Sequence, residues 1–167
     1  MDRALYRKEF ERLADIVFES AGEYDAEMLF TTSSNALTRF ANNVIHQNVA
    51  TDTGNVSVRL QKGKKTGTVT IGLFAEKDVI TAMIKKTIDI VEHGVENNDL
   101  MPILEPQEYK EVDGFSEDTA NLSPAKRADI VGNAIKACEK DGFSAAGNAR
   151  NGATAIGIAN SKGLRAF

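Results

Sequence analysis

Residues 37–52 have the sequence Leu-Thr-Arg-Phe-Ala-Asn-Asn-Val-Ile-His-Gln-Asn-Val-Ala-Thr-Asp, and a second extended run follows at residues 55–61. In residues 37–52 the apolar side chains lie among amide, histidine and arginine side chains, which can form many hydrogen bonds and carry little charge. We therefore predict a polar, amide-rich strand. Because natural edge strands are usually protected by charge or proline, such an edge is open to an extended peptide. The alternative is that these amides only tie adjacent loops to the sheet.

The rest of the chain shows alternating helical and extended patterns. Apolar residues at three- and four-residue steps predict helices over 5–21 and 76–91, and Ser-Pro at 123–124 begins another that ends at Gly142. Alternating patterns predict further strands at 26–31, 66–73, 143–149 and 153–159, with turns at 33–35 and at Asn151-Gly152. A last strand begins at residue 164 and has no mate. Because hairpin signals dominate, we predict an α+β fold, an antiparallel sheet of about six strands with helices packed on one face.

Bulk properties limit the class of protein. The 167 residues suit one domain, 1–167, and 42% apolar with 26% charged residues is ordinary for a soluble globular chain. A net charge of -4 gives no electrostatic footprint for nucleic acid. No signal peptide and no apolar run of membrane-spanning length is present, so we expect a cytoplasmic protein with no membrane partner.

Four short segments carry a family resemblance through their order and spacing. They are Ser-Ser-Asn-Ala-Leu-Thr-Arg-Phe-Ala-Asn-Asn at 33–43, Val-Ser-Val-Arg at 56–59, Lys-Lys-Thr-Gly at 64–67 and Ala-Asn-Ser-Lys-Gly at 159–163. Together they resemble the N-terminal domain of the TldD/PmbA proteins, also called the modulator-of-DNA-gyrase family. The resemblance implies that this chain is a fragment of a longer protein whose catalytic C-terminal domain is absent.

The resemblance also implies a function. The full-length protein is expected to be a cytoplasmic metal-dependent peptidase that acts on unfolded or precursor peptides, with zinc as a possible cofactor. It is expected to form a homo- or hetero-dimer with a TldD/PmbA-type subunit. This domain would supply substrate-groove walls and subunit contacts. The alternatives are a non-catalytic PmbA-type partner subunit, favoured by Arg-Phe-Ala-Asn-Asn at 39–43, or a stand-alone module that binds a peptide or protein.

Matching positions give the candidate groove or interface residues: Arg39, Asn42, Asn43, Arg59, Gly67, Asn160, Ser161 and Gly163. Arg59 alternates with apolar neighbours and is expected to point away from the helices, where a peptide carboxylate or a partner acid would meet its guanidinium. The competing interpretation is an intramolecular salt bridge.

No catalytic or metal-binding residue is predicted in this fragment. His46 and His93 are the only histidines and fall in different elements, and neither His-Glu-x-x-His nor His-Glu-x-x-x-His occurs. We therefore expect the fragment to bind no cofactor and to be inactive alone. The unpaired last strand and the amide-rich edge also predict self-association.

Overall fold

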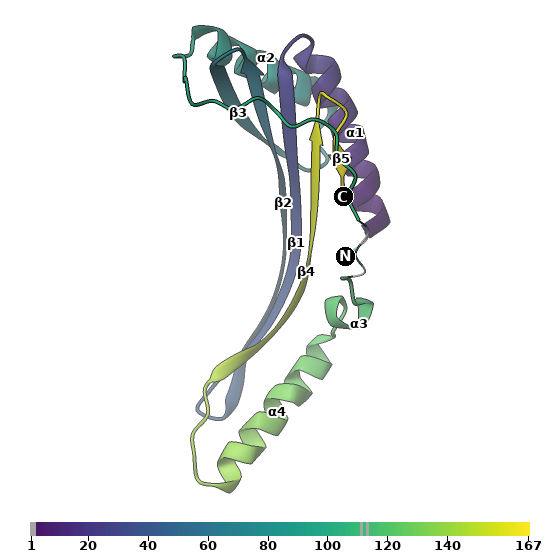
Figure 1. Cartoon of the computed structure of the whole chain (residues 1–167). Coiled ribbons are helices and arrows are strands. Elements are labelled where there is room, and N and C mark those ends of the chain that lie inside the picture. Colours follow the sequence, from purple (N-terminus) through teal and green to yellow (C-terminus); the bar gives the residue numbers. More distant parts are fainter. Residues whose placement is uncertain (1–2, 111, 113) are drawn as a thin grey trace. The chain divides into compact units, whose positions relative to one another are not determined.

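The computed structural model describes residues 3–110, 112 and 114–167 (Figure 1). The elements are α1 (Arg3–Ala21), β1 (Asp25–Ala41), β2 (Val44–Lys62), β3 (Lys65–Gly72), α2 (Lys77–His93), α3 (Glu117–Ala120), α4 (Pro124–Lys140), β4 (Gly147–Asn160) and β5 (Arg165–Ala166). One five-stranded sheet has the strand order β3-β2-β1-β4-β5, in which β2 pairs with β3 and β4 pairs with β5 in antiparallel register. The predicted α+β fold is confirmed, with five strands in place of about six.

The described chain forms two units, and β1, β2 and β4 contribute residues to both. The hairpin unit comprises residues 33–53, 112 and 114–154. The core unit comprises residues 3–32, 54–110 and 155–167. Each is described by itself below.

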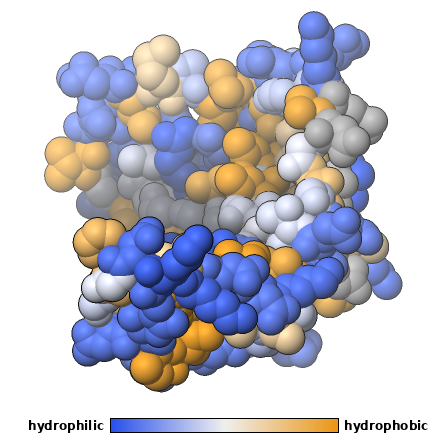
Figure 2. All heavy atoms as spheres, turned by 90° about the horizontal axis from the view of Figure 1, so that it is seen from below, coloured by the Kyte–Doolittle hydropathy of each residue, from blue (hydrophilic) through white to orange (hydrophobic). Residues whose placement is uncertain are grey.

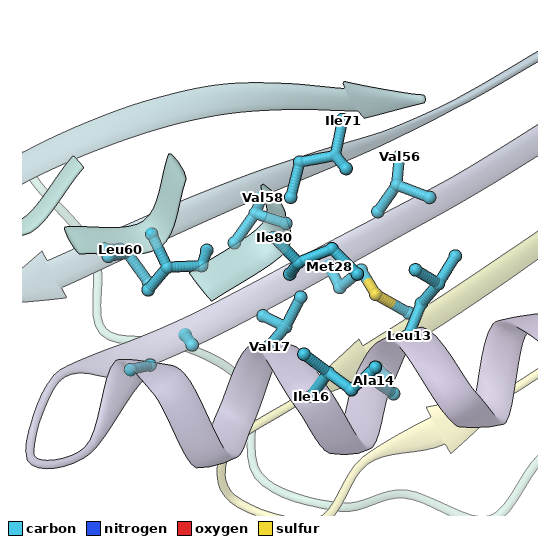
Figure 3. Packing of buried hydrophobic residues seen from close by; sticks show 14 of the residues in the cluster. Leu13, Ala14, Ile16, Val17, Met28, Val56, Val58, Leu60, Ile71 and Ile80 are labelled. Carbon is cyan, nitrogen blue, oxygen red and sulfur yellow. The ribbon is translucent and has the colours of Figure 1, made fainter. Parts of the chain in front are cut away.

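The core unit contains the main apolar cluster, shown in Figure 3. Helix α1 ends at Ala21, before Gly22 with a φ of 60°, a left-handed conformation that suits glycine. Alternate β2 side chains, Val56, Val58 and Leu60, are fully buried against the cluster. Each such side chain contributes about 1.5–3 kcal/mol on burial. The other buried members come from α1, β1, β3, α2 and β4, for example Leu13, Val17, Met28, Ile71, Ile80 and Ala159.

The hairpin unit is built on the second half of β1, the first half of β2 and the first half of β4, together with α3 and α4. Helix α4 begins as predicted, because the Ser123 Oγ accepts a hydrogen bond from the Lys126 amide at 3.2 Å and Pro124 follows the cap. Its buried positions, Arg127, Val131 and Ile135, recur every four residues and so share one face.

Two predicted turns are wrong. Residues 33–35 continue β1, and the chain reverses instead at Asn42 and Asn43, whose φ angles are 51° and 62°. Two left-handed residues form the tight turn that matches the twist of a β-hairpin, and asparagine tolerates this conformation. Asn151-Gly152 lies inside continuous β4. A Cβ at Gly152 would stand 2.6 Å from the Ser34 carbonyl oxygen, so the glycine allows close backbone approach and does not form a turn.

The last strand does have a mate, contrary to prediction. Strand β5 pairs with β4 in antiparallel register, with Ala166 opposite Ile158. The closing residue Phe167 adds ring contacts with Phe10 and Phe30, at centroid distances of 5.6 and 6.1 Å. The C-terminal residues are therefore part of the core unit, and their strand is paired within the chain. Among the described helices, none has the length and apolarity needed to cross a membrane.

Candidate functional site

Three of the predicted residues lie in the hairpin unit. Arg39 is an exposed β1 residue, and within the described chain it forms no ion pair. Asn42 and Asn43 occupy the turn. The Asn43 side chain accepts a hydrogen bond from the Ala145 amide at 2.6 Å and donates one to the Phe143 carbonyl at 3.2 Å. Asn43 thus ties the hairpin turn to the segment before β4, which is the alternative role considered for these amides.

Arg59, in the core unit, forms the intramolecular salt bridge that was the competing interpretation. Its Nη2 lies 2.5 Å from the Glu27 carboxylate, and the two side chains are 39% and 31% exposed. Val58 beside it is fully buried, so Arg59 points to the opposite face of β2. Its guanidinium therefore already has an acid partner within the chain.

Gly67 lies where β3 meets α2. A Cβ there would be 3.1 Å from Val91 Cγ2 and 3.2 Å from the Thr87 carbonyl oxygen. The absence of a side chain lets the helix backbone approach the strand closely. This placement assigns Gly67 a packing role in the core unit.

Asn160, Ser161 and Gly163 form the turn between β4 and β5. The buried Asn160 side chain donates to the Leu104 carbonyl at 2.7 Å, while its Oδ1 accepts from the amides of Lys162 and Leu164, each at 3.1 Å. Ser161 exchanges hydrogen bonds with the backbone of Ala26, and Gly163 has a φ of 98°. These residues hold the turn, the 95–110 segment and the start of β1 together.

The eight predicted residues are thus divided between the units, and each group has its own partners. The sequence patterns missed a buried polar cluster in the hairpin unit, centred on Arg127. Arg127 is 2% exposed, and its guanidinium donates to Thr38 Oγ1 at 3.2 Å, Asn48 Oδ1 at 3.0 Å and Asn151 Oδ1 at 2.8 Å. It also donates to the Leu122 carbonyl at 2.7 Å. All four of these acceptors are neutral, and no carboxylate among the described residues forms an ion pair with Arg127.

The Arg127 cluster gives the amide-rich strand a structural role. Asn48 accepts from both Thr38 and Arg127, so one side of β2 is fixed to β1 and α4. Asn151 extends the cluster, because its Nδ2 donates to the carbonyls of Thr119 and Ala120. A buried polar group needs such partners, since leaving it unpaired is costly.

The outer edge of β2 remains open over residues 44–52. Strand β3 pairs with β2 only from Asn55 onward, and no other described strand lies beyond β2 in the sheet order. All residues from 44 to 52 are exposed, including Val44, Ile45 and Val49 at 62%, 38% and 38%. On the face shown in Figure 2, hydrophobic and hydrophilic residues are intermixed. The open feature of the hairpin unit is therefore a strand edge with a few apolar side chains.

A charged cluster stands beside the β2–β3 turn in the core unit. Lys62 pairs with Glu23 at 2.7 Å and Glu92 at 3.0 Å, and the Tyr24 hydroxyl donates to the Glu92 carboxylate. The hydrogen bond to Glu92 raises the pKa of Tyr24. That bond, together with the hydrogen bond from Lys62, lowers the pKa of Glu92.

A cavity of about 240 Å³ lies at the β2–β3 turn, lined by residues 62–65, Val91, Glu92 and Glu96. Its lysines already have partners within the chain, so we assign the cluster to fixing the turn against α2.

Metal binding is not supported by the described side chains. They contain no group of three or more histidine, cysteine, aspartate or glutamate residues placed to hold a metal ion. The His93 ring nitrogen Nδ1 lies 2.8 Å from the Asp89 carbonyl, as expected for a histidine at a helix end.

Comparisons with known proteins agree with the resemblance seen in the sequence. Residues 26–91 match the family model described as PmbA/TldA metallopeptidase domain 1. The resemblance to the TldD/PmbA family is confirmed. The matched segment runs from β1 to α2 and includes Arg39, Asn42, Asn43, Arg59 and Gly67. No curated protein matches the chain.

Solved structures share the fold of this TldD/PmbA-like chain at low identity. TldE from Thermococcus kodakarensis is 17% identical with a TM-score of 0.81, and the match covers 95% of this chain and 36% of the TldE chain. A putative modulator of a DNA gyrase from Thermotoga maritima MSB8 is 20% identical with a TM-score of 0.73, and the match covers 94% of this chain and 36% of that protein. A putative modulator of DNA gyrase from Bacteroides thetaiotaomicron VPI-5482 is 16% identical with a TM-score of 0.76, and the match covers 99% of this chain and 39% of that protein. The chain therefore spans little more than a third of the length of these proteins.

Proposed function

We propose that this chain is the N-terminal, non-catalytic domain of a TldD/PmbA-like metal-dependent peptidase that acts on unfolded or precursor peptides. In this role it supplies walls of the substrate groove and contacts between subunits of a homo- or hetero-dimer. The observation that carries the proposal is the match of residues 26–91 to the first domain of the family, together with the open β2 edge at 44–52. A peptide or a partner strand can add to such an edge through main-chain hydrogen bonds.

Zinc is the cofactor that the family resemblance implies, and the described residues do not fit it. A zinc site needs three or four suitably placed histidine, cysteine or carboxylate ligands, and no such group is present among them. We therefore propose that any zinc of the full-length protein is bound outside the described residues. No step of the reaction is assigned to this chain.

Two of the predicted residues keep a place in the proposed groove or interface. Arg39 is exposed on β1, and Asn42 is exposed at the turn, so both are available to a peptide or a second subunit. Arg59, Gly67, Asn160, Ser161 and Gly163 act in this proposal by shaping the core unit, since their contacts lie within it. The proposed location is the cytoplasm.

A PmbA-type partner subunit without catalytic metal is the second candidate. The run Arg-Phe-Ala-Asn-Asn at 39–43 favours it. A stand-alone binding module that recruits a peptide or protein, without hydrolysis, is the candidate from a different class of function.

The test is cleavage of unstructured peptides by the full-length gene product, alone and mixed with any paralogue, before and after chelation. Chelator-sensitive cleavage by the protein alone supports the peptidase. Cleavage that appears only in the mixture supports the partner subunit. If neither preparation cleaves peptides, the peptidase proposal fails and the binding module takes its place.

A further inference from the structure

The outer edge of β2 lacks the usual protection against pairing. Over residues 44–52 the sequence contains no lysine, arginine, glutamate or proline, and Asp52 is the one acidic residue. Natural edges are normally blocked by such residues, by bulges or by a covering segment. The register of β3 stops at Asn55, so the described part of the chain provides no strand to cover this edge.

We propose that this edge pairs with the same edge of a second copy of this chain, antiparallel and about a two-fold axis at Val49. This inference rests on the dimerisation role proposed above and names its surface. A two-fold axis places one residue opposite its own copy. With Val49 on the axis, His46 lies opposite Asp52 of the other copy, and Asp52 lies opposite the other His46.

Charge complementarity selects this register. His46 and Asp52 stand three residues before and after Val49, and both are exposed. Because side chains alternate along a strand, the two residues share one face of the sheet and meet across the pair. An imidazole N–H can donate to a carboxylate whether or not the ring carries a charge. An axis at Asn48 would instead place His46 opposite Ala50 and Asp52 opposite Val44.

Apolar contact at the axis adds to the pairing. Val49 is 38% exposed in the described chain, and the proposed register places two valines directly opposite each other. Directly opposed Cβ atoms in antiparallel strands lie about 4.5–5.5 Å apart, close enough for β-branched side chains to touch. A second copy therefore fits the edge in backbone, charge and apolar contact, whereas a general peptide would match only the backbone.

The first test is the mass of the 167-residue chain by light scattering over a range of concentrations. The wild-type chain is expected to approach the mass of a dimer. Val49→Lys places two cations on the axis and is expected to raise the dissociation constant of the dimer at least about tenfold. Val79→Lys is the matched control, because Val79 is an exposed valine on α2 at 51% and lies outside the edge; it is expected to leave the mass unchanged.

The register is tested by cross-linking and by charge exchange. In a Cys138→Ser background, Val49→Cys is expected to form a disulfide-linked dimer under mild oxidation, whereas Val79→Cys is not. His46→Asp sets two carboxylates against each other at both ends and weakens the dimer, while the double exchange of His46→Asp with Asp52→His restores it.

Three results overturn the inference. A monomeric mass for the wild-type chain at high concentration contradicts it, as does a monomer that binds an extended peptide at residues 44–52. A dimer that Val49→Lys does not weaken shows that another surface is used, which leaves the proposed dimerisation role intact. Peptide cleavage by the full-length protein is measured separately, so failure of this inference is distinguishable from failure of the proposed function.

Discussion

Arg127 shows how one side chain can hold an element in place. Its guanidinium joins α4 to Thr38 of β1, Asn48 of β2 and Asn151 of β4, using neutral oxygens as acceptors. Burying a charge is costly unless its donors are satisfied. The cluster supplies these acceptors, so the amides of the hairpin unit are needed for the packing of α4.

We predict that Arg127→Ala weakens the attachment of α4. The change removes four hydrogen bonds and leaves Asn151 Oδ1 and the Leu122 carbonyl without this donor. The free energy of opening of α4, measured by amide hydrogen exchange, should fall by about 2–4 kcal/mol. Lys126→Ala, at the exposed neighbouring position, should change it by no more than about 0.5 kcal/mol. Equal effects of the two variants would contradict the role given to Arg127.

Tyr24 and Glu92 give a prediction about pH. Their hydrogen bond raises the pKa of Tyr24 above its ordinary value of 10.0, so its contribution to stability is complete below pH 10.0 and is lost as pH rises through the raised value. The same bond lowers the pKa of Glu92 below its ordinary 4.5, so that contribution is present above pH 4.5 and is lost as pH falls through the lowered value. The pair therefore stabilises the fold between these limits.

Tyrosine absorbance during an alkaline titration tests this pair. The chain has three tyrosines, and the wild type should show a late-titrating one that Tyr24→Phe removes and Tyr109→Phe retains. If the late transition survives in Tyr24→Phe, the hydrogen bond to Glu92 does not control the ionisation of Tyr24.

Arg127 could not have been predicted from the sequence, because an arginine in an amphipathic helix is usually solvated. Its burial depends on acceptors that are distant in the chain and are brought to α4 by the sheet. Arg59 was more accessible to prediction. The period-two pattern placed it on the face away from the buried residues, and an internal salt bridge was one of the two interpretations considered. Its partner, Glu27, required the three-dimensional fold.

The contact between β3 and α2 depends on Gly67. We predict that Gly67→Ala destabilises the core unit by about 1–3 kcal/mol, because the new methyl group meets the Thr87 carbonyl and the Val91 side chain. Gly72→Ala is a matched control in the same strand, since a Cβ there has no neighbour within 4 Å. Urea denaturation followed by circular dichroism measures both. A Gly67→Ala variant as stable as Gly72→Ala would show that the helix can move away without cost.

Helices were predicted more accurately than strands. The patterns placed α1, α2 and α4 within about two residues of their ends, because periodic apolar residues, a Ser-Pro start and terminal glycines are local signals. Strand limits failed at residues 33–35 and 151–152 because asparagine, serine and glycine have other uses in a sheet. There they take part in hydrogen bonds between β1 and β4 and permit close backbone approach. The true turn at Asn42-Asn43 was hidden in a run rich in amides.

The two units assign different tasks to different parts of the chain. The core unit buries the apolar cluster and holds five of the eight predicted residues in internal contacts. The hairpin unit carries the open edge of β2 and the exposed Arg39. In the proposed function, the first maintains the fold and the second meets peptides or subunits.

We predict that the 167-residue chain alone does not cleave unstructured peptides, with or without added zinc. The reason is that its described residues offer no group of metal ligands. Peptide fragments followed by mass spectrometry would detect any activity. Metal-dependent cleavage by the purified chain, abolished by a chelator, would contradict the non-catalytic role.

The most direct test of the proposed role, a non-catalytic domain that forms groove walls and subunit contacts, is peptide cleavage by the full-length protein carrying Val49→Lys. Bound metal is measured in the same preparation, and Val79→Lys is the control. We predict chelator-sensitive cleavage by the wild type and by Val79→Lys. Val49→Lys should lose at least about tenfold in cleavage rate while its metal content is unchanged, because the edge of β2 guides assembly and does not bind the metal. Unchanged cleavage by Val49→Lys would contradict the role given to the edge of β2, and the absence of chelator-sensitive cleavage by the wild type would contradict the account as a whole.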